Sequence, residues 1–462
     1  MNEATAIDAL RAAIGAGGVL AGDQVPSAHL GDWGITVAAA AGPIAVAYPR
    51  STAEVSAILR ICHAHAIPVV PQGGLTGLAG GATPMSGSIA LSLQRMRAIE
   101  EVDVAAATTT VQAGVPLQAV QEAAEAAGLL FPLDIGSRGS CLIGGNVSTN
   151  AGGTRVLRYG MARELVLGIE AVLADGTVLT ALNKMLKNNA GYDLKHLFIG
   201  SEGTLGVVTR VVLRLFPRPA GVCTAFCALP DYAAVLELLR RARETLAGTL
   251  SAFEVIWPDF FHLAITAHGC RAPLPKGAAC YVLIDGMGAG EANDAETFSA
   301  MIEAALEAGV VTDAVLSQSF RDSRELWSVR DSVVEFQRSF VPRVDFDVSL
   351  PIARMQEFID DCTSHLVGRD ARMRMVWFGH VADSNLHLCV QRQPGGPDKP
   401  EIDAIVYARV RAFGGSISAE HGIGLLTKAY LGYSRTPEEI EVMRRIKAAL
   451  DPAGILNPGK IF

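Results

Sequence analysis

Several features that define common protein classes are missing from this chain of 462 residues. Its eight cysteines include no Cys-x-x-Cys pair, which weighs against an iron–sulfur cluster, a structural zinc module and a disulfide framework. The formal net charge is -8 and no run of Lys and Arg stands out, so a nucleic-acid partner is not expected. The uncharged stretch from Trp33 to Pro49 is alanine-rich and broken by Gly42 and Pro43, so we expect no transmembrane segment.

The composition that is present favours a globular protein with large cores. Hydrophobic residues make up 50% of the chain and charged residues 19%, unlike a disordered polymer. The first residues contain Glu3, Asp8 and Arg11 and lack the basic start and apolar core of a secretory signal, so we expect a soluble, cytoplasmic protein. The 47 glycines indicate many positions where the backbone has a positive φ or approaches a ligand closely.

Helix and strand patterns change near Pro217 and Pro219, where we place a domain boundary. Before it, a capping box at Ser51 and Glu54 opens one helix, and Asp175-Gly176 marks a hairpin turn. After it, helical and strand patterns alternate, which predicts an α+β domain with an antiparallel sheet. The expected helices are 51–66, 116–128, 232–248, 294–309, 323–340, 352–367 and one from 436 onward; the expected strands are 67–71, 204–217, 280–286, 344–350, 373–379 and 385–391.

Two short motifs look like phosphate-binding signatures but fail on context. IDGMGAGE follows an apolar strand, as a dinucleotide fingerprint does, but Glu291 stands where the third glycine should be, so a nicotinamide site is not predicted. GILNPGKI places Ile461 where a phosphate loop needs a hydroxyl residue, and no helix follows it. We interpret the second motif as a terminal turn.

Three glycine-rich segments in the first part of the chain suggest a ligand. Residues 71–81, PQGGLTGLAGG, follow a strand, so their backbone N–H groups can converge on a pyrophosphate, although such turns are common. Residues 139–154 are uncharged and too polar for a helix or a strand, and they are costly to bury unless a ligand pairs with them. With GSEGTLG at 200–206, these segments predict a long cofactor between two subdomains.

His380 and His387, two of only ten histidines, flank the turn of GHVADSNLHLC. The segments MRMVWFG and LHLCVQ can form a hairpin with Asp383, Ser384 and Asn385 at its turn, which would let the two imidazoles meet. This motif alone suits a hydrogen-bonded histidine pair as well as a metal site.

A second segment, SISAEHGIG, favours a metal site over a hydrogen-bonded histidine pair. It offers Glu420 and His421, whose side chains diverge if the backbone is extended. Two histidines and one carboxylate make an open site for zinc or another divalent ion, with positions left for a substrate.

Six motifs occur in a fixed order: PQGGLTGLAGGA, IGGNVSTNAGG, GYDLKHLFIGSEGTLGVVT, GHVADSNLH, SISAEHGIG and LDPAGILNPGKIF. In this order the chain resembles the FAD-dependent D-2-hydroxyacid dehydrogenases of the vanillyl-alcohol-oxidase flavoprotein superfamily. The resemblance implies an α+β flavoprotein of two domains. An FAD-binding domain of two α+β subdomains, of the PCMH type, would span 1–218. A substrate domain with an antiparallel sheet flanked by helices would span 219–462, and its last segment, 451–462, would return to the flavin.

The resemblance also implies FAD, with its pyrophosphate on the 73–77 loop and its ring over 144–153. Leu75 stands where relatives with covalent flavin carry a histidine, so we expect non-covalent FAD. Glu202 and Val208 match positions near the adenosine half. The expected cofactor-binding residues are Gly73, Gly74, Thr76, Gly77, Ser137, Cys141, Gly144, Gly145, Thr149, Gly152, Gly153, Glu202, Gly206, Val208 and Asn457.

By resemblance, His380, His387 and Glu420 are the metal ligands and His421 is the catalytic base, which would also contact the substrate. A metal-bound 2-hydroxy acid has a lowered hydroxyl pKa, and an imidazole can remove that proton near neutral pH. Arg330 is the candidate anchor for the substrate carboxylate. The alternative is a surface ion pair on an amphipathic helix, because other arginines lie nearby in the sequence.

The match weakens at three positions that D-2-hydroxyglutarate dehydrogenases share. Val334, Asp345 and Cys389 replace a threonine, a lysine and an asparagine. A carboxylate at 345 facing a second substrate carboxylate at ~5 Å would cost roughly 3 kcal/mol at an effective dielectric constant near 20. These residues favour a monocarboxylic or less charged D-2-hydroxy acid; alternatively, Arg343 pairs with Asp345 and restores part of the charge balance.

Two alternatives have a different chemistry. One is a non-redox flavoenzyme of the alkyl-glycerone-phosphate synthase type, and the other is a catalytically silent flavin-binding subunit. The main hypothesis requires an electron acceptor that the sequence does not identify: an electron-transfer flavoprotein, a quinone or a cytochrome. A homodimer is compatible with the sequence.

Overall fold

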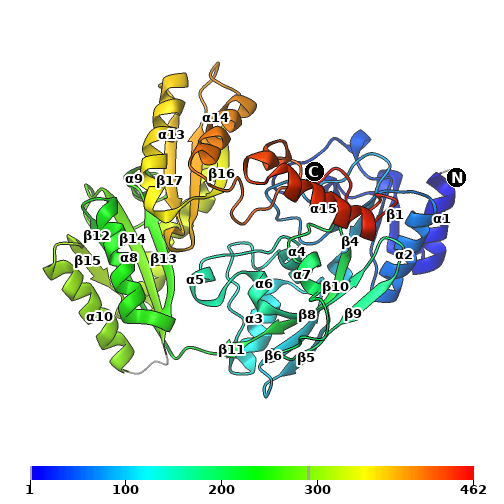
Figure 1. Ribbon diagram of the computed structural model, residues 1–462, viewed down its shortest axis with the longest axis horizontal. Coiled ribbons are helices and arrows are strands. Elements are labelled where there is room, and N and C mark those ends of the chain that lie inside the picture. Colours follow the sequence, from blue (N-terminus) through cyan, green and yellow to red (C-terminus); the bar gives the residue numbers. More distant parts are fainter. Residues whose placement is uncertain (1–2, 289–291) are drawn as a thin grey trace. The chain divides into compact units, whose positions relative to one another are not determined.

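The computed structural model describes residues 3–288 and 292–462, so Glu291 of the IDGMGAGE motif lies outside the described residues. The chain forms two compact units (Figure 1). The first comprises Met1–Gly153, Gly160–Arg218 and Glu420–Phe462, and the second comprises Thr154–Tyr159 and Pro219–Ala419. The segment that rejoins the first unit therefore begins at Glu420, well before residue 451. The short stretch Thr154–Tyr159 belongs to the second unit because Arg158 donates a hydrogen bond to the carbonyl of Met287.

The described part of the first unit contains three sheets, of which the smallest pairs the short strands β7 and β11. A four-stranded sheet has the order β1-β2-β4-β3, in which β2, β4 and β3 are parallel neighbours, and a five-stranded antiparallel sheet has the order β5-β6-β10-β8-β9. The strands are β1 Val19–Ala21, β2 Ala45–Ala47, β3 Val69–Gln72, β4 Ile89–Ser92, β5 Ile99–Asp103, β6 Thr108–Gln112, β7 Leu129–Leu130, β8 Val166–Val172, β9 Val178–Ala181, β10 Val207–Arg214 and β11 Phe216–Pro217. The helices are α1 Glu3–Ile14, α2 Thr52–Ala64, α3 Leu117–Ala126, α4 Ile143–Ser148, α6 Ala162–Leu165, α7 Lys195–Phe198 and α15 Pro437–Leu450.

Local sequence explains the ends of these helices. The Ser51 side chain accepts a hydrogen bond from the Glu54 N–H at the start of α2, and Thr436 and Glu439 form a full capping box at the start of α15. Val55, Ile58 and other apolar residues of α2 are buried in a core that is aliphatic in character.

The second unit is built on one seven-stranded antiparallel sheet with the order β15-β12-β14-β13-β17-β18-β16. Its strands are β12 Gly221–Leu229, β13 Leu250–Ile256, β14 Cys280–Gly288, β15 Asp313–Leu316, β16 Arg343–Ser349, β17 Arg374–Gly379 and β18 Asn385–Gln391. Its helices are α5 Val156–Tyr159, α8 Tyr232–Leu246, α9 Pro258–Thr266, α10 Ala292–Glu307, α11 Phe320–Asp331, α12 Phe336–Ser339, α13 Met355–Arg369 and α14 Lys399–Ala412.

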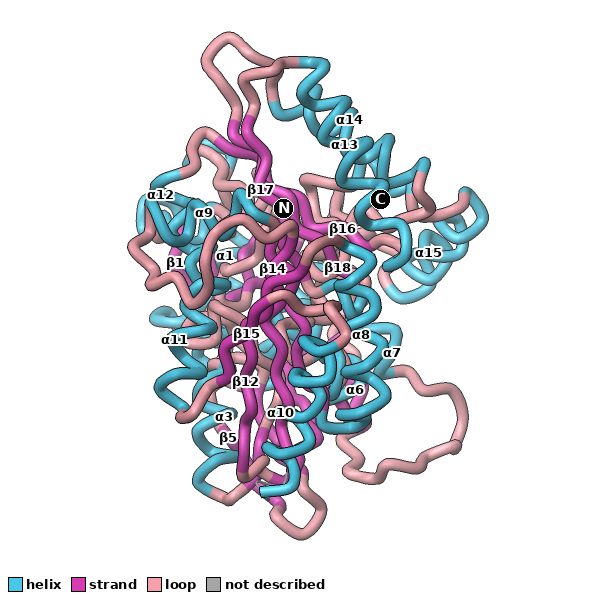
Figure 2. Tube along the Cα trace, turned by 90° about the vertical axis from the view of Figure 1, so that its left-hand side faces the viewer, coloured by secondary structure: helices cyan, strands magenta, loops and turns pink. Residues whose placement is uncertain are grey.

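Helices cover both faces of this sheet. On one face, Phe298 of α10 lies against Gly286, and Trp377 and Phe346 meet aromatic rings of α13 and α14. On the other face, α9 and α11 pack through Phe261 and Ser323. Figure 2 shows α11 and α8 on opposite sides of strands β12 and β14. Because alternate residues of a strand share a face, the side of α9 and α11 also receives Glu254, Asp285, Asp345, Asp347, His387 and Cys389.

Two expected elements differ from the structure. The helix predicted over 323–340 begins earlier, at Phe320, because the Ser319 side chain caps it, and it breaks after Asp331 into a 3-10 turn and the short α12. The segment predicted to be irregular over 139–154 contains α4, because the carbonyls of Leu142 and Gly145 accept helical hydrogen bonds from Asn146 and Thr149.

The α+β class and the antiparallel sheet of the second unit are confirmed. Within the described residues, no helix combines the length and the apolar character needed to cross a bilayer.

Candidate functional site

The first two glycine-rich segments lie against each other in the first unit. A Cβ added at Gly74 would overlap the carbonyl oxygen of Ser140, and one added at Gly73 would lie 3.5 Å from the Cα of Gly145. At Gly74 only a residue without a side chain permits this approach, whereas a Cβ at Gly73 would make an ordinary van der Waals contact. The loop that follows β3 is thereby fixed on the start of α4.

The third segment is hydrogen bonded to the end of α4. The N–H groups of Gly200 and Glu202 donate to the carbonyls of Val147 and Ser148, at 3.1 and 2.8 Å. Gly206 packs against Phe198, and the side chain of Val208 is buried in the five-stranded sheet. The three segments predicted to share one cofactor are therefore joined in one part of the first unit.

Glu202 has a positive φ, and its buried carboxylate accepts two backbone hydrogen bonds. Its Oε1 accepts from the N–H of Ile423 at 2.7 Å, and its Oε2 accepts from the N–H of Gly424 at 2.8 Å. Burial raises the pKa of Glu202, and these two backbone hydrogen bonds oppose that rise. The carboxylate thus holds the segment that follows His421, a contact that the sequence did not indicate.

Asn457 ties the C-terminal turn to the same region. Its Nδ2 donates to the carbonyls of Gly81 and Glu202, while its buried Oδ1 has no hydrogen-bond partner among the described residues. A buried acceptor of this kind suits a polar ligand, because leaving it unpaired costs free energy. Closely packed glycine backbones and an unpaired acceptor fit the FAD that the sequence implies.

The other predicted cofactor residues lie in or beside these glycine-rich segments. Gly77 approaches the carboxylate of Asp32, Thr149 caps α4, and Gly153 packs on the carbonyl of Asp134. Ser137 accepts from the N–H of Cys141, and the remaining predicted positions are Thr76, Gly144, Gly145 and Gly152.

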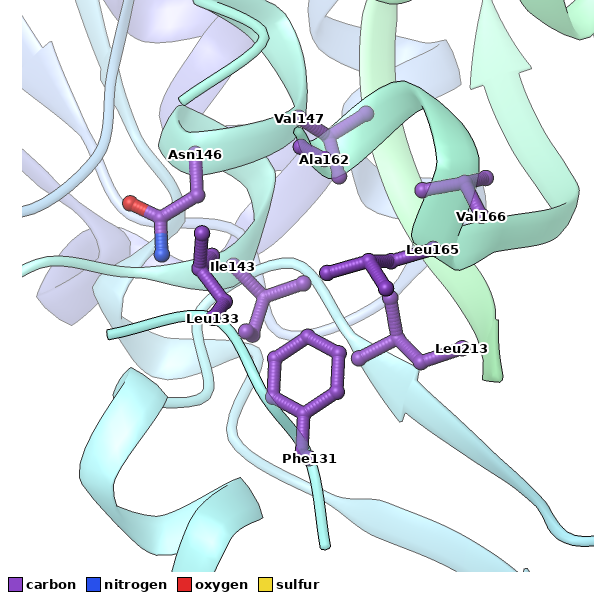
Figure 3. A pocket seen from close by; sticks show the side chains of 9 residues that line it. All are labelled: Phe131, Leu133, Ile143, Asn146, Val147, Ala162, Leu165, Val166 and Leu213. Atoms are coloured by element: carbon purple, nitrogen blue, oxygen red, sulfur yellow. The ribbon is translucent and has the colours of Figure 1, made fainter. Parts of the chain in front are cut away.

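A small apolar pocket lies beneath α4 (Figure 3). Its walls come from α4, α6 and β10, and Asn146 supplies its one polar side chain. The Asn146 Nδ2 donates to the Sγ of Cys141 at 3.6 Å, so its amide is already engaged. We interpret the pocket as part of the core; its lining residues are Phe131, Leu133, Ile143, Asn146, Val147, Ala162, Leu165, Val166 and Leu213.

The second unit brings the two histidines of the hairpin together. His380 follows β17, and His387 lies in β18 opposite Phe378. Their ring centroids are 5.4 Å apart and nearly perpendicular, and both side chains are buried. One ligand atom from each, together with one from Glu420, lie within 4.8 Å of one another. Two imidazoles and a carboxylate at this separation suit a divalent cation such as zinc.

Asp347 explains why Glu420 reaches the histidines. The N–H of Ala419 lies 3.2 Å from both the carbonyl and the Oδ2 of Asp347, so the residue before Glu420 is held by β16. The Oδ1 of Asp347 accepts from Asn385 and lies 3.6 Å from the Nδ1 of His387.

A buried carboxylate also backs the first histidine. Glu254 of β13 is 1% exposed; its Oε1 is hydrogen bonded to the Nδ1 of His380, and its Oε2 accepts from the Nε of Arg330 at 2.8 Å. Burial acts to raise the pKa of Glu254, but the charges and hydrogen bonds of His380 and Arg330 lower it to about 2. The carboxylate is therefore ionised.

Arg330 is buried, so the alternative of a surface ion pair on an amphipathic helix is wrong. Its Nη2 lies 3.4 Å from the Nε2 of His380, and its guanidinium stacks over Phe378. A cationic fork beside the histidine pair is well placed to bind an anion.

Asp345, which argues against hydroxyglutarate as the substrate, has a charged partner in the structure. The Nε of Arg343 donates to the Oδ2 of Asp345 at 2.8 Å, so the expected pairing occurs. Cys389 pairs with Asp345 across β16 and β18, and burial, followed by the charge of Asp345, raises the pKa of the Cys389 thiol well above its usual range. Val334 is exposed.

Sequence reasoning missed Glu254 and Asp347. They stand in the strands LSAFEVI and RVDFDVS, and an acid between apolar residues of a strand was the available signal. Buried carboxylates need partners, and those partners come from distant parts of the chain.

Comparisons with known proteins define the family. Residues 43–182 match the FAD binding domain family, and residues 218–461 match the family of FAD linked oxidases, C-terminal domain. The chain therefore belongs to the FAD-linked oxidases, and it is a flavin-dependent oxidoreductase.

Sequence relatives place it more narrowly. It is 43% identical to the mitochondrial D-2-hydroxyglutarate dehydrogenase of Bos taurus, over 90% of this chain and 76% of that one. It is 41% identical to the D-2-hydroxyglutarate dehydrogenase of Xanthomonas citri pv. viticola, over 91% and 89%, and 36% identical to that of Stutzerimonas stutzeri over the whole of both chains. The chain is thus a member of the FAD-dependent D-2-hydroxyacid dehydrogenase family of the vanillyl-alcohol-oxidase superfamily.

Solved structures agree on the fold. A 4-ethylphenol oxidase from Gulosibacter chungangensis has a TM-score of 0.77 at 20% identity and covers 99% of this chain and 96% of its own. An alkyldihydroxyacetonephosphate synthase has a TM-score of 0.76 at 18% identity, over 99% and 86%. At these identities the likeness shows the fold alone, so it does not favour the non-redox alternative.

Proposed function

We propose that this protein oxidises a D-2-hydroxy acid to the 2-oxo acid, using non-covalent FAD and a divalent metal ion such as zinc. The observation that carries the proposal is the cluster of His380, His387 and Glu420, with Arg330 beside it, in a chain of this family. Bound FAD would supply the hydride acceptor, and the bound ion would supply the Lewis acidity that lowers the pKa of the C2 hydroxyl.

Each side chain of the proposed site has a separate role in the reaction. His380, His387 and Glu420 hold the ion, and Arg330 binds the substrate carboxylate through its donor fork. His421 takes the hydroxyl proton, because imidazole is the side chain that most often acts as a general base. The O–H and C2–H bonds of the substrate would break as its C2=O double bond forms; the proton would pass to His421, and the hydride with its two electrons would pass to the flavin.

Two substrate classes are distinguished by Asp345. A second carboxylate near this side chain is disfavoured, although Arg343 offsets part of its charge, so we propose a D-2-hydroxy acid with a less charged side chain. D-2-hydroxyglutarate is the second candidate, favoured by the names of the relatives. We further propose that 1–218 binds FAD, that 219–462 carries the substrate site, and that the C-terminal segment 451–462 returns to the flavin. Reoxidation by an electron-transfer flavoprotein, a quinone or a cytochrome, a homodimeric state and a cytoplasmic location remain predictions.

Anaerobic mixing of the purified protein with D- and L-2-hydroxy acids tests the proposal. D-lactate and D-2-hydroxyglutarate should be compared, while the flavin band near ~450 nm reports reduction. A D-acid should bleach the flavin, its L-isomer should not, and a chelator should slow the bleaching. Failure of every D-acid to reduce the flavin of metal-loaded protein would contradict the proposal.

A further inference from the structure

We propose that Glu254 is a positioning residue that sets the proton position of His380 and the orientation of Arg330 at once. The inference rests on the proposed metal site, and it adds a residue outside the predicted ligands and base. Glu254 comes from β13, a strand whose residues are all buried, and it is far in sequence from both partners.

The proton position follows from hydrogen-bond chemistry. The Oε2 of Glu254 accepts from the Arg330 Nε, and its Oε1 is hydrogen bonded to the His380 Nδ1, so a carboxylate in this position selects the His380 tautomer that carries its proton on Nδ1. The Nε2, which lies 3.4 Å from the Nη2 of Arg330, is then the unprotonated nitrogen, the form in which an imidazole ligates a metal ion. Carboxylates that hold a ligating imidazole in this way raise its basicity and fix its orientation.

The same carboxylate fixes the arginine. Its second oxygen accepts from the Arg330 Nε, which leaves the Nη2 3.4 Å from the His380 Nε2. The guanidinium plane is further held over the ring of Phe378. One carboxylate thus sets both the ligand nitrogen and the cationic fork that would meet a metal-bound anion.

A purely structural role explains this network less well. Burying a carboxylate and a guanidinium in an apolar sheet costs desolvation energy that their attraction only partly returns, so such a pair is weak evidence for stability. Orientation of two functional groups accounts for both hydrogen bonds of the carboxylate.

Glu254→Gln is the most informative variant. It keeps the shape of the side chain but replaces one acceptor oxygen by an NH₂ group, which cannot accept from the Arg330 Nε or the His380 Nδ1. Chelator-treated, FAD-loaded protein is titrated with ZnCl₂ in a calorimeter. The variant should bind zinc 10–100-fold more weakly, as the loss of such outer partners does elsewhere. Asp285→Asn is the matched control: it neutralises another buried carboxylate on the same sheet face, and its zinc affinity should equal that of the wild type.

A second measurement does not depend on how the variant folds. Nitrogen-15 NMR of histidine-labelled, metal-free wild type, assigned with His380→Asn, should show the proton of His380 on Nδ1. A proton on Nε2, or equal zinc affinity in Glu254→Gln and wild type, would overturn the inference while leaving the proposed function intact. Absence of stoichiometric zinc binding by the wild type would contradict the metal site itself and, with it, this inference.

Discussion

The two units hold their buried glutamates in different ways. In the first unit, both oxygens of Glu202 accept backbone N–H groups, and its pKa is raised by burial. In the second unit, Glu254 pairs with two cationic or cation-forming side chains, and its pKa falls to about 2 although burial opposes this. Backbone dipoles alone do not offset burial here, whereas charged partners do.

This difference extends to the surroundings. The first unit brings glycine backbones together, so we expect its function to depend on the absence of side chains at these positions. The second unit displays acids and histidines on one face of a sheet, so we expect its function to depend on which side chains are charged. An added methyl group should therefore damage the first unit, and a neutralised carboxylate should damage the second.

The largest effect should come from His421, which follows the boundary between the units at Glu420. His421→Ala should slow flavin reduction by at least ~100-fold, the low end for loss of a general base. Single-turnover mixing with excess D-acid measures this rate. The exposed His262 is the control: His262→Ala should reduce flavin at the wild-type rate. An unchanged rate in His421→Ala would remove the assignment of the base.

A smaller effect should come from a single methyl group at Gly145. No described heavy atom lies within 4 Å of a Cβ placed there, so Gly145→Ala should not destabilise the cofactor-free protein. If FAD lies over this helix, the methyl group should weaken FAD binding by about tenfold, equivalent to ~1.4 kcal/mol. Flavin fluorescence during titration of the apoprotein reports the affinity.

Gly368 of α13 supplies the matched control. It is also helical, and its Cβ would likewise meet no described atom within 4 Å. Gly368→Ala should leave FAD affinity unchanged and raise stability slightly, because alanine favours the helix by up to about 1 kcal/mol. Equal FAD affinities in the two variants would place the flavin elsewhere.

The sequence predicted the fold better than it predicted the contacts of the site. Glycine spacing and strand periodicity are local, so the loops, the Asp175-Gly176 hairpin and the antiparallel sheet could be read directly. Glu202 accepts a hydrogen bond from Ile423, which is 221 positions away in the sequence. Glu254 is hydrogen bonded to His380, which is 126 positions away. Such pairs depend on tertiary packing, which no local pattern encodes.

Glu202→Gln tests the first unit at the glutamate itself. An amide must present an NH₂ group to one of the two backbone donors, so the segment after His421 loses a hydrogen bond, which costs about 1–3 kcal/mol of stability. We expect flavin reduction to slow only severalfold, since His421 remains. FAD affinity should stay close to that of the wild type, and a large loss would instead favour the contact with adenosine that the resemblance implies.

The smallest effect on turnover belongs to Asp285, whose replacement should change only the pH dependence of stability. Burial raises the pKa of Asp285 to about 6, although hydrogen bonds from Thr224 and Trp327 oppose the rise. The folded protein then holds this proton more tightly than the unfolded chain does, so stability falls as pH rises through the interval up to about 6 and is level above it. Between about pH 4.5 and about pH 7.5 the loss is about 2 kcal/mol. Asparagine does not titrate, so the denaturation midpoint of Asp285→Asn should rise relative to wild type across this range. If the denaturation midpoints of the two proteins changed in parallel with pH, the pKa of Asp285 would be the same in the folded and unfolded states. The contrast between carboxylates with and without charged partners would then not hold.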